Sequence, residues 1–357
     1  MLLAGAAVTR PDGLLVYGIC GLFVEGAVLL RPGSLRAPIA WLSQRLRTHA
    51  GLFLIFAPAL VFRVVYYGEL VPNTFYAKSA HDPYAGQGLH YLSLYLSAYW
   101  LLLGIPVLLV AAGFARLRAK RSLRPPFAGA IAAAVVGAYV AYVVWVGGDF
   151  MFARFLIPVT PLALLLLEAL LRDLWESLEW RWDARAAGAA ALILAGAVLL
   201  RYDPYRCEPA PIIQYVGEEQ KIYTPERVRY MRELALKLRP TIQSAQPLIE
   251  FVGAQSVLIY YLDPATAIES QTGLTDRFIA RQPVTERGWV GHEKTAPLSY
   301  LNERGVHLLL RPPPPDRRRP ESVFRIAGLP GEFEILNYDE AVFAILRQDA
   351  SFQLPAP

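Results

Sequence analysis

The chain has 357 residues, of which 55% are hydrophobic and 18% are charged. A soluble domain has about 45–50% apolar and about 25% charged residues, so this chain carries too much apolar side chain to fold in water alone. Its apolar residues form long runs and it has two cysteines, which excludes a disordered protein, a collagen, a coiled coil and a small disulfide-bonded scaffold. The composition therefore predicts a membrane protein.

The formal net charge is +5, but the basic residues do not form one patch. Many of them lie in short segments between apolar runs, as is typical of the cytoplasmic loops of membrane proteins. A nucleic-acid-binding surface would need them gathered together. We therefore expect no nucleic-acid partner.

A helix needs about 20 mostly apolar residues to cross a hydrocarbon core of about 30 Å. About six stretches come close to this, at 14–30, 51–67, 89–113, 127–146, 155–171 and 184–200. The segments after the first, third and fifth stretches are rich in arginine, which predicts that they stay in the cytoplasm. The opposite side then receives 1–13, 68–88, 147–154 and everything after residue 201. An amino terminus on that side without a signal peptide predicts a further spanning segment upstream.

The chain thus divides into a predicted transmembrane domain, 1–200, and a predicted extracytoplasmic domain, 201–357. In the second, residues 224–238 predict a helix with Thr224 as N-cap and Pro225 in its first turn. Short apolar runs predict strands at 248–252, 306–310, 324–327, 333–336 and 341–346. The predicted fold class is an α-helical polytopic membrane domain followed by a smaller α/β extracytoplasmic domain.

Residues 66–78, YYGELVPNTFYAK, join polar groups to aromatic side chains. The tyrosines alone are typical of the aromatic belt at a membrane surface. However, Pro72 fixes the backbone, and Asn73 with Thr74 predicts the cap of a short helix along the interface, with Lys78 about one turn further on. Such a loop presents a cation and amide donors that suit an anionic lipid phosphate.

Residues 146–155, VGGDFMFARF, separate two apolar stretches by a short turn. Gly147 and Gly148 permit a tight backbone, and Asp149 and Arg154 lie next to the apolar region. One interpretation is structural, with Asp149 capping the next helix and pairing with Arg154. The other is that the carboxylate orients a hydroxyl or binds a metal, and the residues leave both open.

Two further segments carry candidate residues. In TRPDG, residues 9–13, Asp12 alone is typical of an N-cap in a Pro-Asp-Gly turn, but the predicted topology places it on the same side of the membrane as the two loops above. In the tail, His292 and Glu293 invite a metal site. A single His-Glu pair without a second histidine at helical spacing is too little to predict zinc.

Taken in order, the motifs TRPDG, YYGELVPNTFYAK, GGDFMFARFLIPVTPL, GLTDRFIAR and GHEK resemble those of bacterial polyprenyl-phosphate-dependent membrane glycosyltransferases of the GT-C type. The likeness is nearest to the mycobacterial terminal arabinofuranosyltransferases and to related membrane proteins associated with flagellar motor control, and it covers nearly the whole chain. It implies a multi-pass protein of the bacterial inner membrane. It also implies transfer of a sugar, such as arabinofuranose, from a polyprenyl-phosphate donor to an envelope glycan on the extracytoplasmic face. The implied partners are that donor, the glycan acceptor and membrane lipid.

The resemblance also suggests roles for single residues. An inverting transferase needs a carboxylate to accept the acceptor's hydroxyl proton and cations to stabilise the departing phosphate. The carboxylates would be Asp149 and Asp12, and the phosphate would be held by Lys78 and Arg154. Substrate orientation and binding would fall to Asn73, Tyr76 and His292. Metal dependence stays open, with a divalent cation as one option.

The chain departs from the family pattern in one respect. In GT-C enzymes the leading acid lies in the first outer loop after the first span, and this chain has no counterpart of that loop. The expected explanations are a truncated reading frame, an inactive protein or a substitute acid. The alternative function is therefore a non-catalytic envelope scaffold or motor-associated membrane protein that retains the GT-C fold.

Overall fold

The computed structural model of the chain describes residues 2–10, 12–29, 38–79, 81–106, 109–110, 127–177 and 212–356. The chain forms two compact units, the first made of Met1–Val71 with Pro83–Ala210 and the second of Pro72–Asp82 with Pro211–Pro357. The predicted boundary at residue 200 lies outside the described residues. The division differs from the predicted one because the loop Pro72–Asp82 is part of the carboxy-terminal unit.

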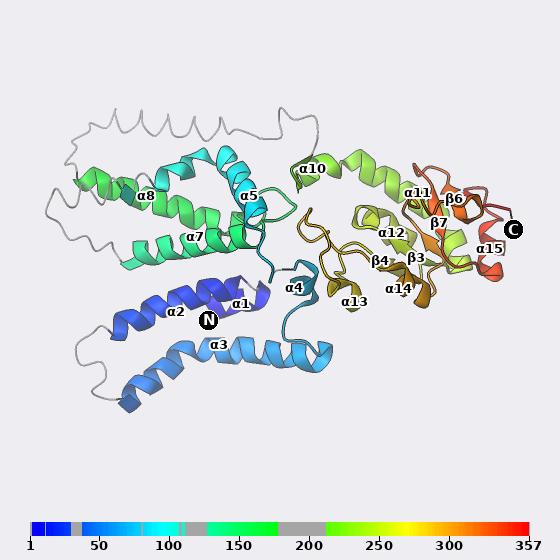
Figure 1. Cartoon of the computed structure of the whole chain (residues 1–357). Coiled ribbons are helices and arrows are strands. Elements are labelled where there is room, and N and C mark those ends of the chain that lie inside the picture. The colour runs from blue at the N-terminus through cyan, green and yellow to red at the C-terminus, as the bar shows by residue number, and fades with distance from the viewer. Residues whose placement is uncertain are drawn as a thin grey trace. The chain divides into compact units, whose positions relative to one another are not determined.

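The first unit is helical (Figure 1). Its elements are α1 (Leu2–Thr9), α2 (Gly13–Leu29), α3 (Pro38–Tyr67), α5 (Ala85–Ala98), η1 (Trp100–Leu103), α7 (Phe127–Trp145), η2 (Ile157–Val159) and α8 (Thr160–Ser177). Helix α7 contacts α2, α5 and α8, and α1 contacts α2 and α3. Helix α7 is apolar all round, as expected of a helix that has no water-facing side.

One helical segment among the described residues, His49–Tyr67 of α3, has the length and apolar composition needed to cross a membrane. The apolar segments Gly13–Ala27 and Gly129–Trp145 are shorter. Side chains along α3 are exposed, including Leu54 at 69% and Val65 at 80%. The rest of the described chain does not cover these side chains.

The predicted apolar stretches correspond to the helices unevenly. The stretch 14–30 is α2, and 51–67 is the second half of the longer α3. The stretch 89–113 is interrupted, because α5 ends at Ala98 and a 3₁₀ turn follows. The stretch 184–200 lies outside the described residues. Helix α3 begins earlier than its apolar run because its polar first half pairs with α2, where Glu25 accepts hydrogen bonds from Arg45 at 2.9 Å and His49 at 3.0 Å.

The second unit contains a mixed sheet. Its elements are α4 (Asn73–Ala77), β1 (Ile212–Ile213), β2 (Val216–Gly217), α10 (Glu219–Ile222), α11 (Pro225–Ala245), β3 (Leu248–Phe251), η3 (Gly253–Gln255), α12 (Ser256–Leu262), β4 (Thr266–Glu269), α13 (Arg277–Ala280), α14 (Leu298–Glu303), β5 (Leu308–Leu309), η4 (Pro320–Ser322), β6 (Val323–Ile326), β7 (Phe333–Ile335), α15 (Glu340–Leu346) and β8 (Phe352–Gln353). Six strands lie in the order β4-β3-β5-β7-β6-β8. Strands β4, β3 and β5 are parallel, and the remaining pairs are antiparallel.

The core of this unit lies between the sheet and the helices α11, α12 and α15 (Figure 1). Leu238 and Ile242 of α11 pack with Ile249 of β3, Phe324 of β6 and Phe343 of α15, all of them at most 1% exposed. Helix α11 forms because its apolar side chains recur at helical spacing and Thr224 caps it, accepting a hydrogen bond from the backbone nitrogen of Arg227 at 3.3 Å. The unit therefore has a hydrophobic core of its own.

Several local predictions are confirmed and three are wrong. The cap at Thr224 and the strands near 248, 308, 324 and 333 are present. Residues 341–346 form helix α15 instead of a strand, because Asp339 caps them and their apolar side chains recur at helical spacing. Helix α11 extends to Ala245, past the predicted end and through Pro240. In the loop, Pro72 occupies the N-cap position of α4 without a side-chain cap, so Asn73 starts the helix instead of capping it.

Glu250 provides a test of the core of the second unit. It lies fully buried on β3, hydrogen-bonded by Ser270 and 3.4 Å from the Nε atom of Arg311. Burial raises the pKa of Glu250 above its ordinary 4.5, although Arg311 opposes the shift. Well below pH 4.5 the group is neutral in both the folded and unfolded states. As the pH rises from there through the folded pKa, the unfolded chain releases its proton first and the fold loses stability.

We therefore expect Glu250→Gln to remove part of this loss. Thermal unfolding measured from pH 4 to pH 7 should show a smaller decrease in midpoint for the variant than for the unchanged chain. Glu303→Gln, at an exposed position on α14, is the matched control and should leave the pH dependence unaltered. Parallel curves for Glu250→Gln and the unchanged chain would contradict the assignment.

Candidate functional site

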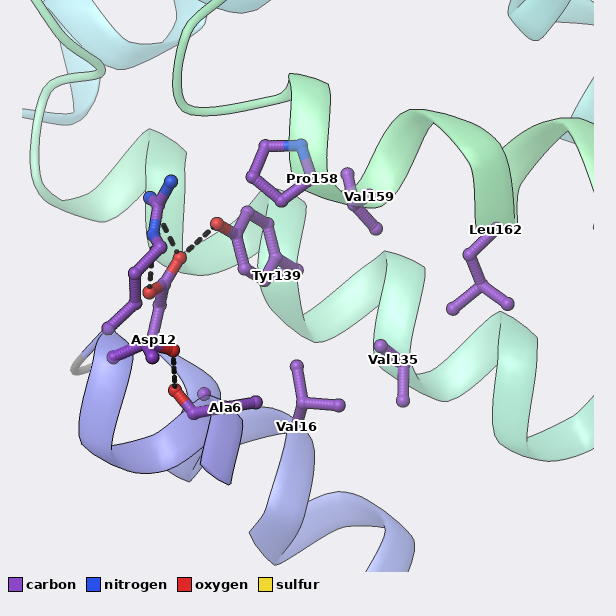
Figure 2. A pocket seen from close by; sticks show the side chains of 11 residues that line it. Ala6, Asp12, Val16, Val135, Tyr139, Pro158, Val159 and Leu162 are labelled. Atoms are coloured by element: carbon purple, nitrogen blue, oxygen red, sulfur yellow. Dashed lines mark hydrogen bonds and ion pairs between the residues drawn. The ribbon is translucent and has the colours of Figure 1, made fainter. Parts of the chain in front are cut away.

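Asp12 lies directly before α2, and its side chain is held by two others (Figure 2). Arg10 donates from Nε to Oδ1 at 3.0 Å and approaches Oδ2 with its terminal nitrogen, also at 3.0 Å. The hydroxyl of Tyr139, on α7, donates to Oδ2. The sequence-based alternative, an N-cap, is right about position, since the backbone carbonyl of Asp12 accepts from Leu15 nitrogen at 3.1 Å. The carboxylate itself faces Arg10 and Tyr139.

The Asp12 carboxylate lines a cavity of about 220 Å³. Most of the other side chains around it are apolar and come from α1, α2, α7, η2 and the first turn of α8 (Figure 2). The lining residues are Ala6, Thr9, Arg10, Asp12, Gly13, Val16, Val135, Tyr139, Pro158, Val159 and Leu162. An apolar cavity with a few convergent polar groups is the usual form of a small-molecule site, so this cavity is the first candidate.

The charges of Arg10 and Asp12 at this cavity stabilise each other. Burial alone lowers the pKa of Arg10, but the hydrogen bond and attraction from Asp12 outweigh it and the pKa is raised. The Asp12 side chain is 9% exposed and that of Arg10 46%. A fixed carboxylate that is still accessible can accept a proton from a hydroxyl placed in the cavity. Tyr139 was not a candidate from sequence, because neither tyrosine of this apolar helix carries a distinguishing signal.

The turn after α7 positions Asp149. Gly147 and Gly148 have φ values of +89° and +75°, which favour glycine, and the nitrogen of Gly148 bonds to the carbonyl of Val143 at 2.8 Å to close the end of α7. Asp149 then forms an ion pair with Arg154. The predicted tight turn and the predicted pairing are both confirmed.

Arg154 and the buried Tyr91 hold this turn in place. The guanidinium of Arg154 lies 5.1 Å from the ring centre of Phe150, and Tyr91 donates its hydroxyl to the carbonyl of Met151 at 3.1 Å. Since the Asp149 side chain is 0% exposed, it does not reach a substrate in this conformation. The structural interpretation of Asp149 is therefore the better supported one, and a direct catalytic role stays a prediction.

Four other sequence candidates, Asn73, Tyr76, Lys78 and His292, lie in the second unit. Asn73 donates from Nδ2 to the carbonyl oxygens of Gly273 at 2.6 Å and Leu274 at 3.0 Å. The ring of Tyr76 lies under the guanidinium of Arg281, 4.1 Å from its ring centre. These contacts join the NTFYAK loop to the GLTDRFIAR segment, so both residues have a structural role and their contact with a substrate stays a prediction.

Lys78 connects the same loop to the GHEK segment. Gly291, at φ +83°, comes so close that a Cβ built on it would lie 3.4 Å from the Cγ atom of Lys78. His292 lies one residue further on, with its ring 5.9 Å from that of Trp289 and edge-on to it. The described residues contain no group of three histidine, cysteine or acidic side chains that could hold a metal ion.

The motifs thus separate between the two units. TRPDG and GGDFMFARF belong to the first unit, and NTFYAK, GLTDRFIAR and GHEK to the second. Within the first unit, Asp12 and Asp149 each pair with an arginine of their own motif. Within the second, the NTFYAK loop contacts the GLTDRFIAR and GHEK segments, which lie about 200 residues further along the chain. A common centre that combines Asp149 and Arg154 with Asn73, Tyr76 and Lys78 stays a prediction.

Comparison with known proteins points to glycosyl transfer. Parts of the chain are similar to the terminal β-(1→2)-arabinofuranosyltransferases of two bacteria. The relative from Corynebacterium glutamicum is 38% identical over 107 residues, covering 27% of this chain and 16% of that protein. The relative from Mycobacterium tuberculosis is 35% identical over 178 residues, covering 42% of this chain and 28% of that protein. The matched regions are therefore less than a third of these curated relatives.

No family model and no solved structure matches the chain. The similarity is nevertheless to the same kind of enzyme that the motifs indicate, so the chain is related to glycosyltransferases at the level of partial sequence similarity.

Proposed function

We propose that the chain belongs to a membrane glycosyltransferase that moves a sugar, such as arabinofuranose, from a polyprenyl-phosphate donor to an envelope glycan on the extracytoplasmic face. The observation that carries the proposal is the Asp12 carboxylate at an apolar cavity, held by Arg10 and Tyr139. An isoprenoid donor needs an apolar wall for its lipid chain, and the acceptor hydroxyl needs a base.

In this proposal the first unit lies in the bacterial inner membrane as a multi-pass domain. The exposed apolar side chains of α3 and the apolar circumference of α7 support this, because lipid would remove both from water. The second unit lies outside the cytoplasm and contributes acceptor contacts through its loop 72–82 and its GHEK segment.

Asp12 accepts the proton of the acceptor hydroxyl as that oxygen attacks the anomeric carbon, and the polyprenyl phosphate leaves. A cation near the departing phosphate stabilises its charge. Within the first unit, Arg10 could supply this cation, because its side chain lies beside Asp12 and is half exposed. Lys78 and Arg154 keep this role as sequence-based assignments.

The direct test is incorporation of radiolabelled sugar from a lipid-linked donor into envelope glycan by membranes containing the chain. We expect Asp149→Asn to lower incorporation by destabilising the turn, and Lys78→Met to lower it at subsaturating donor with a smaller effect at saturation. Incorporation unchanged in both variants would remove these residues from the mechanism. Membranes lacking the chain that incorporate equally would refute the function.

A second candidate is a non-catalytic envelope protein of the same fold. It is favoured by one observation, which is that both candidate carboxylates are in ion pairs. Arg10 contacts both carboxylate oxygens of Asp12, and Arg154 pairs with the carboxylate of Asp149. This alternative expects no sugar transfer by the intact chain. It expects the Asp12 and Asp149 variants to alter stability alone.

A further inference from the structure

The second unit contains a cavity beside the loop 72–82 and the GHEK segment, and none of its lining residues lines the cavity at Asp12. It measures about 140 Å³ and lies between the loop Pro72–Asp82 and the segment that follows α13. The lining residues are Tyr76, Ser79, His81, Asp82, Ala280, Arg281, Gln282, Pro283, Val284 and Lys294. All of them belong to one compact unit, so its walls form within that unit.

The two walls are tied together at several points. Asn73 binds the carbonyl of Gly273 at 2.6 Å, and Arg287 donates to the carbonyl of Asp82 at 3.0 Å. Between these ties, the guanidinium of Arg281 stacks over the ring of Tyr76. A cavity with fixed walls binds a ligand without first having to order its own side chains.

Lys294 contributes a buried ammonium group to this cavity. Lys294 is only 4% exposed, and its Nζ atom donates a hydrogen bond to the carbonyl of Gln282 at 2.5 Å. No described carboxylate forms an ion pair with it, and the adjacent Glu293 is bound to Arg287 at 3.2 Å. Burial lowers the pKa of Lys294, although Glu293 and Asp82 oppose the shift. An ammonium group has three donors, so two of them lack a described acceptor.

Ser79 contributes a second buried donor. The residue is 1% exposed, and its hydroxyl oxygen has no hydrogen-bond partner among the described residues. Its φ of +46° is left-handed, which costs a non-glycine residue about 1–2 kcal/mol. A buried polar group without a partner is also unfavourable. A ligand oxygen in the cavity would give this hydroxyl the partner that it lacks among the described residues.

We propose that this cavity binds a phosphoryl group, with Lys294, Ser79 and Arg281 as its donors. These donors come from both walls, which suits a tetrahedral oxyanion with several acceptor oxygens better than a planar carboxylate. Asp82 also lines the cavity, but its side chain is 54% exposed and lies 3.4 Å from His81. The phosphoryl group belongs either to a free phosphate or to a phosphorylated lipid, and the experiment separates the two.

The test uses the full chain in a phosphate-free detergent, titrated calorimetrically at constant ionic strength. One arm uses inorganic phosphate and the other geranyl phosphate, a soluble prenyl monophosphate. We expect Lys294→Met to weaken binding about tenfold or more, because it removes a charged donor, and Ser79→Ala about threefold, because it removes a neutral one. Lys237→Met, at an exposed position on α11, is the charge-matched control and should bind as the unchanged chain does.

Binding of both ligands that depends on Lys294 and Ser79 supports a site for phosphate itself, and binding of geranyl phosphate alone supports a lipid phosphate. Absence of binding in both arms overturns the proposal, as does equal weakening by Lys237→Met. If Lys294→Met fails to fold, Ser79→Ala decides the matter, since it removes only one oxygen. The readout is binding, so a negative result here leaves the proposed sugar transfer at Asp12 standing, and the reverse also holds.

Discussion

Sugar transfer by the Asp12→Asn variant is expected to be about 10²–10⁴-fold slower than by the unchanged chain, because a general base contributes about that much to proton transfer. Asparagine keeps the size of the side chain and one acceptor oxygen but cannot take the proton. The measurement is the initial rate of labelled-sugar incorporation at saturating donor. Thermal unfolding of the same preparations separates lost chemistry from lost fold.

Two further variants sharpen this test. Tyr139→Phe removes one hydrogen bond to Asp12 and keeps the ring, so we expect a decrease of about tenfold or less. Asp263→Asn is the matched control: it makes the same chemical change in an exposed ion pair with Arg239, at a left-handed position that asparagine tolerates. Full activity of a folded Asp12→Asn protein would assign Asp12 to structure alone.

Gly148→Ala is expected to destabilise the first unit by about 2–5 kcal/mol, the sum of a left-handed alanine and an overpacked contact. A Cβ at this position would lie 2.4 Å from the ring of Tyr91, which is itself fully buried. Neither the turn nor the ring can yield, because the hydroxyl of Tyr91 is fixed to the carbonyl of Met151. The unfolding midpoint in detergent should fall clearly, and sugar transfer with it.

Gly129→Ala is the control for this experiment. Its Cβ would meet nothing within 4 Å, and it lies in helix α7, where alanine is favoured over glycine by about 1 kcal/mol. The two substitutions are chemically identical, so the midpoint should fall in one case and stay or rise in the other. Equal effects would show that the close approach of Gly148 to Tyr91 does not limit stability.

Much of the local structure could be predicted from sequence because it depends on neighbours in the chain. The cap at Thr224, the turn at Gly147 and Gly148, and the pairing of Asp149 with Arg154 all follow from residues a few positions apart. The short apolar run 341–346 fits the period of a strand and the period of a helix equally well, and the prediction of a strand overlooked the N-cap at Asp339. The interruption after Ala98 was missed for a similar reason, since hydropathy does not register a change of backbone conformation.

The candidate sites depended on longer-range contacts. Asp12 was noticed from its turn, but its partner Tyr139 is 127 residues away and no pattern links the two. Ser79 and Lys294 are separated by a still longer stretch of chain, and the cavity between them exists only because Asn73 and Arg287 tie the loop to the tail.

The amino-acid sequence by itself determined the excess of apolar side chain and the order of the polar motifs, because these depend only on composition and spacing. The motifs also carried the resemblance to glycosyltransferases. The tertiary structure decided which motifs meet. It moved the loop Pro72–Asp82 into the carboxy-terminal unit, buried Asp149 and left Asp12 at a cavity. The physical reason is that burial and the pairing of distant side chains are properties of the packed chain, which local spacing does not encode.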